Sequence, residues 1–238
     1  MKVAELWRFP VKSLGGERLE SVAVSDGGIE GDRGFAIFDR VSGLGLTARR
    51  VPELLFATAR LRGDGSLEIV AADGSRIGTD EASLSSWLGR PVELRDASKT
   101  GVRRYENTTD PEHEETAPWQ AFEGAGGRFH DSPRARVSLV STGTIGEWDR
   151  RRFRSNVLIT GEGEDALVGG RLAVGTAILS VGMAISRCVM VTRPQPGGVE
   201  RDIDVLGRIA RERDGRLAVG ALVEQPGTVC VGDSIEPA

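Results

Sequence analysis

The sequence has few of the residues that usually build disulfide frameworks and metal clusters. Two cysteines and two histidines occur among 238 residues, and aromatic residues make up 5% of the chain. Two cysteines cannot form the disulfide framework of a small secreted domain, and no CxxC motif or Cys/His cluster indicates a zinc site. The cysteine content therefore predicts a protein of a reducing compartment, and we expect a cytoplasmic location.

Long apolar segments are also missing, and none approaches the length of a membrane span. The first residues, "MKVAELWRFPVKS", lack the apolar core of a signal peptide before Arg8 and Pro10. The net charge of −4 gives no overall basic field that would attract nucleic acid or an anionic membrane. We therefore expect neither a nucleic-acid partner nor a membrane partner.

What the sequence does contain is glycine: 32 of them separate many short apolar segments, a pattern typical of strands and tight turns. Several segments alternate apolar and polar residues, as half-buried strands do. Strands or hairpins are expected at 1–8, 18–25, 34–49, 54–77, 91–97, 135–141, 156–160, 171–175, 177–181, 188–192 and 216–236.

Two helices are expected between these strands. The first covers 79–90, with Asp80 as its N-cap and Gly89 as its stop. The second covers 204–214, with Asp204 as its cap and Gly215 as its stop. Strands and helices do not alternate as βαβ units would, so we expect a mainly β fold with a few helices.

The segment 99–130 differs from the rest because it has few β-branched residues, several acids and no clear period. Long segments of this kind are usually functional loops or linkers. We therefore expect a barrel-like β architecture that is interrupted by a long loop or linker at 99–130.

Four short stretches place polar groups inside this strand pattern: 10–13, 31–49, 150–156 and 186–188. Lysine, serine and arginine side chains can bind phosphate or another anion. In an extended segment Arg154 and Asn156 would point to the same side and face one ligand. The ordinary interpretations are an exposed loop, a turn with an ion pair, and a solvated arginine face.

Cys188 follows Arg187 at the start of the segment 188–192, and its neighbours leave three roles open. A guanidinium favours the thiolate, which is the form that binds metals and attacks electrophiles. A buried cysteine can also act as a small apolar residue in a strand. A dyad with His113 or His130 would require the segment 99–130 to fold back. Cys230 alternates as a core residue, and we expect no function for it.

Taken in order, these stretches resemble the MOSC family, named for the C-terminal part of molybdenum-cofactor sulfurase, and especially its two-part members related to the mitochondrial amidoxime-reducing component. Each motif is weak alone, but their order and spacing together are specific. The resemblance implies an N-terminal β-barrel-like domain at 1–98, the linker at 99–130 and a second β-barrel domain, the MOSC domain, at 131–238; the first strands could also be shared between the two domains. The matching residues are Pro10-Val11-Lys12-Ser13, Gly31-Asp32-Arg33, Thr47-Ala48-Arg49, "HDSPRARVSLVST" from His130, Arg152-Phe153-Arg154-Ser155-Asn156, Ser186-Arg187-Cys188 and the closing stretch Pro226–Asp233.

The resemblance implies that Cys188 supplies a thiolate to the molybdenum of a molybdopterin cofactor, with no need for pyridoxal phosphate. It also implies that the cofactor is held by Lys12, Ser13, Arg33, Arg49, Arg154, Asn156, Ser186, Arg187 and Cys188.

The activity implied by the resemblance is reduction of an N-hydroxylated or N-oxide small molecule, with electrons from a separate reductase or ferredoxin-type protein. Acids in the segment 99–130 (Glu106, Asp110, Glu112, Glu114 and Glu115) could steer that donor or simply increase solubility. Two other functions stay open from the sequence. One is a carrier of sulfur, as a Cys188 persulfide, or of the cofactor itself. The other is an inactive barrel that binds a partner or another anion.

Overall fold

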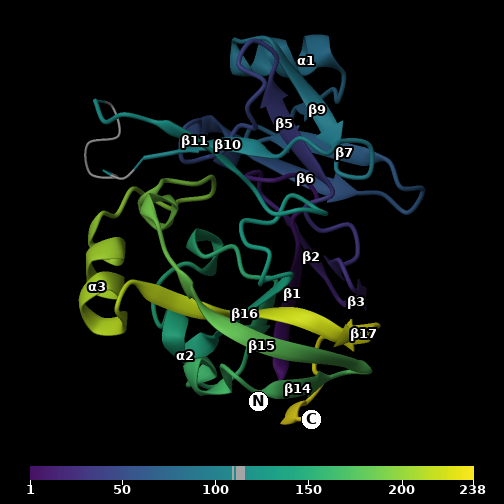
Figure 1. Ribbon diagram of the computed structural model, residues 1–238, viewed down its shortest axis with the longest axis vertical. Helices are drawn as coiled ribbons and strands as arrows, with labels where there is room; N and C mark the ends of the chain where they lie inside the picture. Colours follow the sequence, from purple (N-terminus) through teal and green to yellow (C-terminus); the bar gives the residue numbers. More distant parts are fainter. Residues whose placement is uncertain (109, 111–115) are drawn as a thin grey trace.

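The computed structural model describes residues 1–108, 110 and 116–238, and strands dominate these residues (Figure 1). The largest sheet has eight strands and fills the lower half of Figure 1. Its strands, in spatial order, are β18 (Ile235–Pro237), β14 (Arg171–Val174), β15 (Ala177–Ser186), β16 (Arg216–Gln225), β12 (Val137–Ser141), β13 (Val157–Ile159), β1 (Val3–Arg8) and β2 (Glu17–Leu19).

Strands from both ends of the chain build this large sheet. β1 pairs antiparallel with β13, where Leu6 lies opposite Val157, and β13 pairs parallel with β12. The long antiparallel pair of β15 and β16 shifts register between Val181 and Met183 and again between Ala184 and Ser186. Such bulges increase local twist, and the sheet curls into a half-barrel. Its inner face is packed with branched apolar residues such as Leu139 and Ile159, both fully buried.

Smaller sheets form the upper half of Figure 1 and have a core of their own, which includes Val11, Leu54 and Ile69. The strands and helix of this region are β5 (Phe35–Asp39) paired with β9 (Val92–Asp96), then β6 (Ala57–Leu61), β7 (Leu67–Ala71) and β8 (Arg76–Ile77), with helix α1 (Glu81–Leu88) beside β9. A third small sheet pairs β3 (Ser21–Ser25) with β4 (Gly28–Ile29) and β17 (Gly227–Cys230). The mainly β class expected from the sequence is confirmed.

The two expected helices are present, one with a different cap. The Asp80 side chain accepts the Ser83 N–H of α1 at 3.0 Å, and Gly89 ends that helix with φ +64°. Helix α3 (Asp204–Arg213) has Asp204 as its first residue, so the expected cap at this position is wrong. Asp202 instead accepts the Asp204 N–H at 3.0 Å, because an acceptor just before the first turn reaches its free amides.

Two segments differ from the sequence expectation. The segment 99–130 contains a hairpin of β10 (Arg104–Asn107) and β11 (Gln120–Glu123), in which the Tyr105 and Phe122 rings lie 6.0 Å apart. β11 is exposed along its whole length and β10 buries only Tyr105, so the two strands lack an apolar alternation. His113, Glu112, Glu114 and Glu115 lie outside the described residues.

The expected strand at 188–192 is wrong, because Val189–Thr192 forms a 3-10 turn. Its carbonyls bond locally and to arginine: the Thr192 hydroxyl donates to Val189 O at 2.8 Å and Arg152 donates to Val191 O at 3.1 Å. These tertiary contacts override the strand propensity of the β-branched residues. The division at 99–130 into two domains stays a prediction. Within the described residues, no helix is both long and apolar enough to span a membrane.

Candidate functional site

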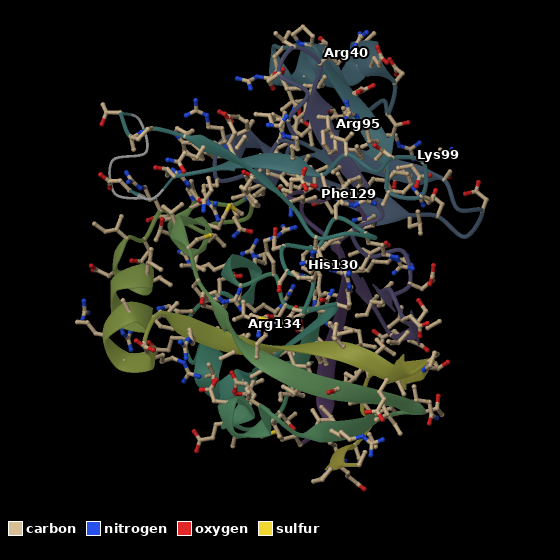
Figure 2. All side chains as sticks on the ribbon, viewed as in Figure 1. Arg40, Arg95, Lys99, Phe129, His130 and Arg134 are labelled. Atoms are coloured by element: carbon tan, nitrogen blue, oxygen red, sulfur yellow. The ribbon has the colours of Figure 1, made fainter. Side chains whose placement is uncertain are left out.

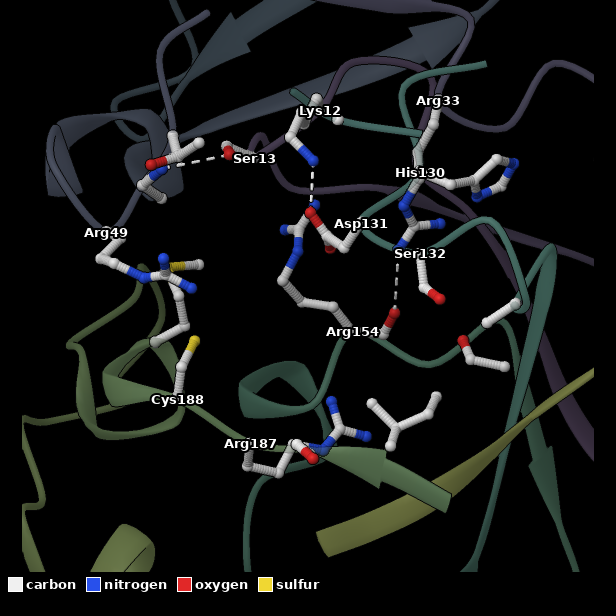
Figure 3. A pocket seen from close by; sticks show the side chains of 18 of the residues that line it. Lys12, Ser13, Arg33, Arg49, His130, Asp131, Ser132, Arg154, Arg187 and Cys188 are labelled. Atoms are coloured by element: carbon white, nitrogen blue, oxygen red, sulfur yellow. Dashed lines mark hydrogen bonds and ion pairs between the residues drawn. The ribbon is translucent and has the colours of Figure 1, made fainter. Parts of the chain in front are cut away.

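A cavity of about 480 Å³ lies where the large sheet meets the smaller sheets. Figure 2 places Phe129 and His130 in this region, between the two halves. The cavity brings together all four polar stretches singled out in the sequence. The nine candidate residues that line it are Lys12, Ser13, Arg33, Arg49, Arg154, Asn156, Ser186, Arg187 and Cys188 (Figure 3).

Lys12 and Ser13 lie in the turn after β1. The Lys12 side chain is only 6% exposed. Its ammonium group donates to Phe129 O at 3.2 Å and forms an ion pair with Asp131. Ser13 has φ +71°, and its hydroxyl accepts the Ala48 N–H at 3.1 Å. The hydroxyl therefore joins the first stretch to the loop that contains Arg49.

Arg33 and Arg154 share one aromatic ring. Their guanidinium carbons lie 5.2 Å and 4.5 Å from the centre of the Phe9 ring. Buried Asp32 fixes this corner, because it pairs with Arg33 and accepts the Phe9 N–H at 2.7 Å. Cations over an aromatic face are stabilised by its quadrupole. The ring thus offsets part of the repulsion between two close positive charges.

Arg154 remains available to a ligand. Among the described residues, no hydrogen bond or ion pair engages its guanidinium, which projects into the cavity in Figure 3. Burial, together with the nearby Arg33, lowers the pKa of Arg154 to about 9. The side chain is still protonated at neutral pH and is attracted by the carboxylates of Asp131 and Asp32. The cavity thus contains a charged donor with no hydrogen-bond acceptor among the described residues.

Arg187 and Arg152 tie together the segments on either side of Cys188. Arg187 donates to Phe153 O at 2.9 Å and to Leu217 O at 2.7 Å, while Arg152 donates to Val191 O and to Glu200 O at 2.7 Å. Burial lowers the pKa of Arg187 to about 10. Its Nη2 atom is buried and has no partner among the described residues, so one further acceptor would fit there.

Cys188 lies directly after β15 and lines the cavity as a free, partly buried thiol. In Figure 3 its sulfur points toward Arg49, whereas the Arg187 guanidinium points in a different direction. Arg49 itself is held by Asn107: the Arg49 Nη1 atom donates a hydrogen bond to the side-chain oxygen of Asn107. The sequence neighbour Arg187 is therefore engaged by backbone carbonyls, and Arg49 is the guanidinium toward which the thiol is directed.

Asn156 lines the cavity, but its amide is occupied by the protein. It donates to Trp7 O at 3.2 Å and accepts from the Ser138 amide and hydroxyl at 3.2 and 2.9 Å. Arg154 has φ +52°, so the chain is not extended there, and the expected common side of Arg154 and Asn156 has no geometric basis. The contacts of Asn156 link β1, β12 and β13.

Two protein-family models match most of this chain. The family model for the MOSC N-terminal beta barrel domain matches residues 1–120, and the model for the MOSC domain matches residues 126–236. The chain belongs to the MOSC-domain proteins. The resemblance of the ordered motifs to the MOSC family is thereby confirmed. Residues from both matched regions line the cavity.

Similarity to individual known proteins is distant. The molybdenum cofactor sulfurase of Drosophila grimshawi is 25% identical over 260 residues, covering 94% of this chain but 32% of the relative. The chain thus spans about a third of that protein. The structural match to the YUAD protein of Bacillus subtilis covers 98% of this chain and 93% of that protein, with 15% sequence identity and a TM-score of 0.47. The match to YiiM of Geobacillus stearothermophilus covers 58% of this chain and 72% of that protein, with 13% sequence identity and a TM-score of 0.37.

Asp131 also lines the cavity of this MOSC-domain protein, although sequence reasoning gave it no role. Its side chain is 85% exposed and stands in the open cavity. Partial desolvation by the surrounding protein would raise its pKa, but Lys12 and Arg33 outweigh this and hold the pKa of Asp131 well below its usual range. The signal was its position in the "HDSPRARVSLVST" motif, six residues before the start of β12.

His130 is buried, and its Nε2 lies 3.1 Å from Gly27 O. Burial, followed by the charge of Arg33, lowers the pKa of His130 to about 4. Figure 3 shows His130 and Cys188 on opposite sides of the cavity, so the structure does not form a dyad from them. The alternative partner, His113, lies outside the described residues.

The contacts of Asn156 generate one prediction. Asn156→Ala should lower the free energy of unfolding by about 2–4 kcal/mol, because it leaves several buried groups of β1 and β12 without partners. Arg154→Ala is the matched control and should change it by less than about 1 kcal/mol, since only its contact with Phe9 is lost. Urea denaturation of both variants measures this. Wild-type stability of Asn156→Ala would show that the amide is free for a ligand.

The depressed pKa of His130 generates a second prediction. The unfolded chain takes up a proton near pH 6.5, whereas the folded chain does so only near pH 4. The contribution of His130 to stability is therefore present above pH 6.5 and is lost as the pH falls toward 4. The free energy of unfolding should decrease by about 2 kcal/mol between pH 7.5 and 5 from this group. Denaturation curves of His130→Gln across this range should lack most of that decrease; an identical slope would contradict it.

Proposed function

We propose that this chain binds molybdenum cofactor and reduces N-hydroxylated or N-oxide substrates, with Cys188 as the thiolate ligand of the metal. One observation carries the proposal: a free thiol faces the same cavity as an uncommitted, charged guanidinium, that of Arg154. A soft thiolate suits a metal that is already bound by sulfur, and guanidinium groups suit phosphate.

The residues of the cavity fit an anionic, acceptor-rich cofactor. Its volume of about 480 Å³ falls within the roughly 300–1,000 Å³ of small-molecule sites. Two buried guanidinium nitrogens on its lining, Arg187 Nη2 and Arg136 Nη1, have no partner among the described residues. Buried donors normally find an acceptor, so these atoms are matched by a ligand with several oxygens.

In this proposal Lys12, Ser13, Arg33 and Arg154 bind the phosphate end of the cofactor, and Cys188 binds the metal. Arg49, Ser186 and Arg187 lie around the thiol and complete the cradle, while Asn156 acts through the strands that it links. When bound, the cofactor supplies two-electron, oxygen-transferring chemistry. The overall reaction takes an N–OH group, two electrons and two protons to an N–H group and water.

The titrating residues of the cavity place a limit on this reaction. The Asp131 carboxylate has a pKa well below its usual range, and His130 has a pKa of about 4. At neutral pH the first is ionised and the second is neutral, so neither holds an acidic proton. In the proposed reaction both consumed protons therefore come from solvent through the open side of the cavity, while Asp131 accepts hydrogen bonds and holds Lys12.

A separate electron donor is part of the proposal. The two cysteines of this chain cannot bind an iron–sulfur cluster that needs four thiolates, and no dinucleotide fingerprint occurs in the sequence. A reductase or ferredoxin-type protein would supply the electrons. Free thiols also suit a reducing compartment, so we place the reaction in the cytoplasm. Of the acids that could steer the donor or simply increase solubility, Glu106 already pairs with Arg50, whose Nε lies 3.8 Å from its carboxylate.

A second candidate function is that of a carrier of sulfur or of molybdenum cofactor without turnover. It is favoured by the similarity of 94% of this chain to part of a protein named molybdenum cofactor sulfurase. A Cys188 persulfide or a stored cofactor would use the same thiol and the same cations. Catalytic turnover with a chemical reductant distinguishes the two functions, because a carrier binds cofactor but does not reduce substrate.

The ligand role of Cys188 predicts the following. Cys188→Ser should lower N-oxide reduction by more than about 100-fold, because an oxygen ligand changes the electronics of the metal and even losing an outer partner costs 10–100-fold. Cys230→Ser is the matched control: Cys230 lies on β17, outside the cavity lining, with its sulfur 3.3 Å from the Ser21 hydroxyl. Activity per bound molybdenum measures the effect, and equal values for wild type and Cys188→Ser would rule out the ligand.

The need for a donor predicts a second outcome. Protein purified from a cofactor-competent host should give no sustained reduction with NADH or NADPH alone. A chemical reductant such as a reduced viologen, or an added reductase or ferredoxin, should restore it. Substrate consumption is followed over many turnovers. Sustained turnover with NADPH and no second protein would contradict the proposed donor, and molybdenum-loaded protein inactive with viologen would favour the carrier.

A further inference from the structure

Tyr105, the only tyrosine of the chain, is held rigidly beside the cavity. Two glycines confine its ring: a Cβ added at Gly45 would lie 2.3 Å from Cε1, and one added at Gly124 would lie 2.7 Å from Cε2. The rings of Phe38 and Phe122 each lie 6.0 Å from that of Tyr105. Packing on all these sides fixes the position of the phenol.

The hydroxyl of Tyr105 is not used by the protein. The residue is 2% exposed, and its oxygen is buried without a hydrogen-bond partner among the described residues. A buried hydroxyl left unpaired costs about 1–3 kcal/mol, and phenylalanine would fill the same space without that cost. Burial, with a smaller contribution from the charge of Asp131, raises the pKa of Tyr105 well above its usual range. The group therefore remains a donor at physiological pH.

The neighbours of Tyr105 place it on the ligand-binding wall. The Lys12 ammonium lies 4.9 Å from the centre of its ring. Two residues further along β10, on the same face, Asn107 holds Arg49. Tyr105 thus lies between the cation that pairs with Asp131 and the guanidinium toward which Cys188 points.

We propose that the Tyr105 hydroxyl donates a hydrogen bond to an oxygen atom of the ligand bound in this cavity. The inference deepens the proposed function and rests on it. The oxygen belongs either to the bound cofactor or to the N–O group of the substrate, and both offer an acceptor to a neutral phenol. Tyr105 is then a binding residue that the sequence motifs do not contain.

Tyr105→Phe tests the inference because it removes the oxygen and keeps the ring. Ser155→Ala is the matched control, since Ser155 Oγ is also buried without a partner in the described chain but is not part of the cavity lining. In cofactor-free protein, Tyr105→Phe should not lower the melting temperature. A clear decrease would reveal an internal partner for the hydroxyl and overturn the proposal.

The two sources of the oxygen give different results. If the cofactor supplies it, molybdenum retained by Tyr105→Phe after dialysis should fall several-fold, with no such loss in Ser155→Ala. If the substrate supplies it, molybdenum content should match wild type and KM for an N-hydroxylated amidine should rise about tenfold, near the upper end of what a hydrogen bond between neutral groups contributes. Wild-type retention and wild-type KM together would overturn the proposal.

A spectroscopic measurement separates this proposal from the proposed function. Because the chain has one tyrosine, protein labelled with ¹³C at tyrosine Cζ gives one resonance, which responds to hydrogen bonding of the phenol. This resonance should shift between cofactor-free and cofactor-loaded protein, or on addition of the N-hydroxylated amidine. If wild type binds no molybdenum, the proposed cofactor is wrong. Titration with inorganic phosphate then decides whether Tyr105 senses a bound anion, and an unmoved resonance overturns the inference.

Discussion

Repulsion between positive charges in one cavity is the constraint on which the rest of the site depends. Among the described residues, the lining contains seven cationic side chains and two acidic ones: Lys12, Arg33, Arg49, Arg136, Arg152, Arg154 and Arg187 against Glu106 and Asp131. Backbone carbonyls take up much of this charge, as they do for Arg152 and Arg187, and the Phe9 ring takes up more. The positive charge that these contacts do not compensate lies on the cavity lining, where a bound polyanion would neutralise it.

The backbone shares in holding these charges together. Ser13, Arg33 and Arg154 all have positive φ, a conformation that costs a residue with a side chain roughly 1–3 kcal/mol. Glycine would adopt it easily but would carry no donor. The three residues come from separate stretches of the chain and meet at one cavity. The strain therefore lies where the donor groups are needed, and the surrounding sheets must offset it.

Much of the fold and the list of lining residues followed from the sequence, because strand alternation and ordered motifs are local signals. The contacts of those residues did not follow. The extended geometry assumed for Arg154 was wrong because positive φ in a residue other than glycine leaves no mark in the sequence. The strand expected after Cys188 was wrong because distant arginine donors bind its carbonyls. Tyr105 was missed because its hairpin is polar and exposed on one side, and its role depends on two glycines that lie far from it in sequence.

The pairing of β1 with β13 and of β17 with β3 has a consequence for biosynthesis. Residue 3 lies opposite residue 159, and residues 21–24 pair with residues 227–230, so these sheets close only when the chain as far as residue 230 is available. The N-terminal strands leave the ribosome long before their partners are made. Such distant pairings form late and slowly. Cys188 and the arginines around it can then face Lys12 only after residues 227–230 have been made, so the cavity cannot be loaded before that point of synthesis.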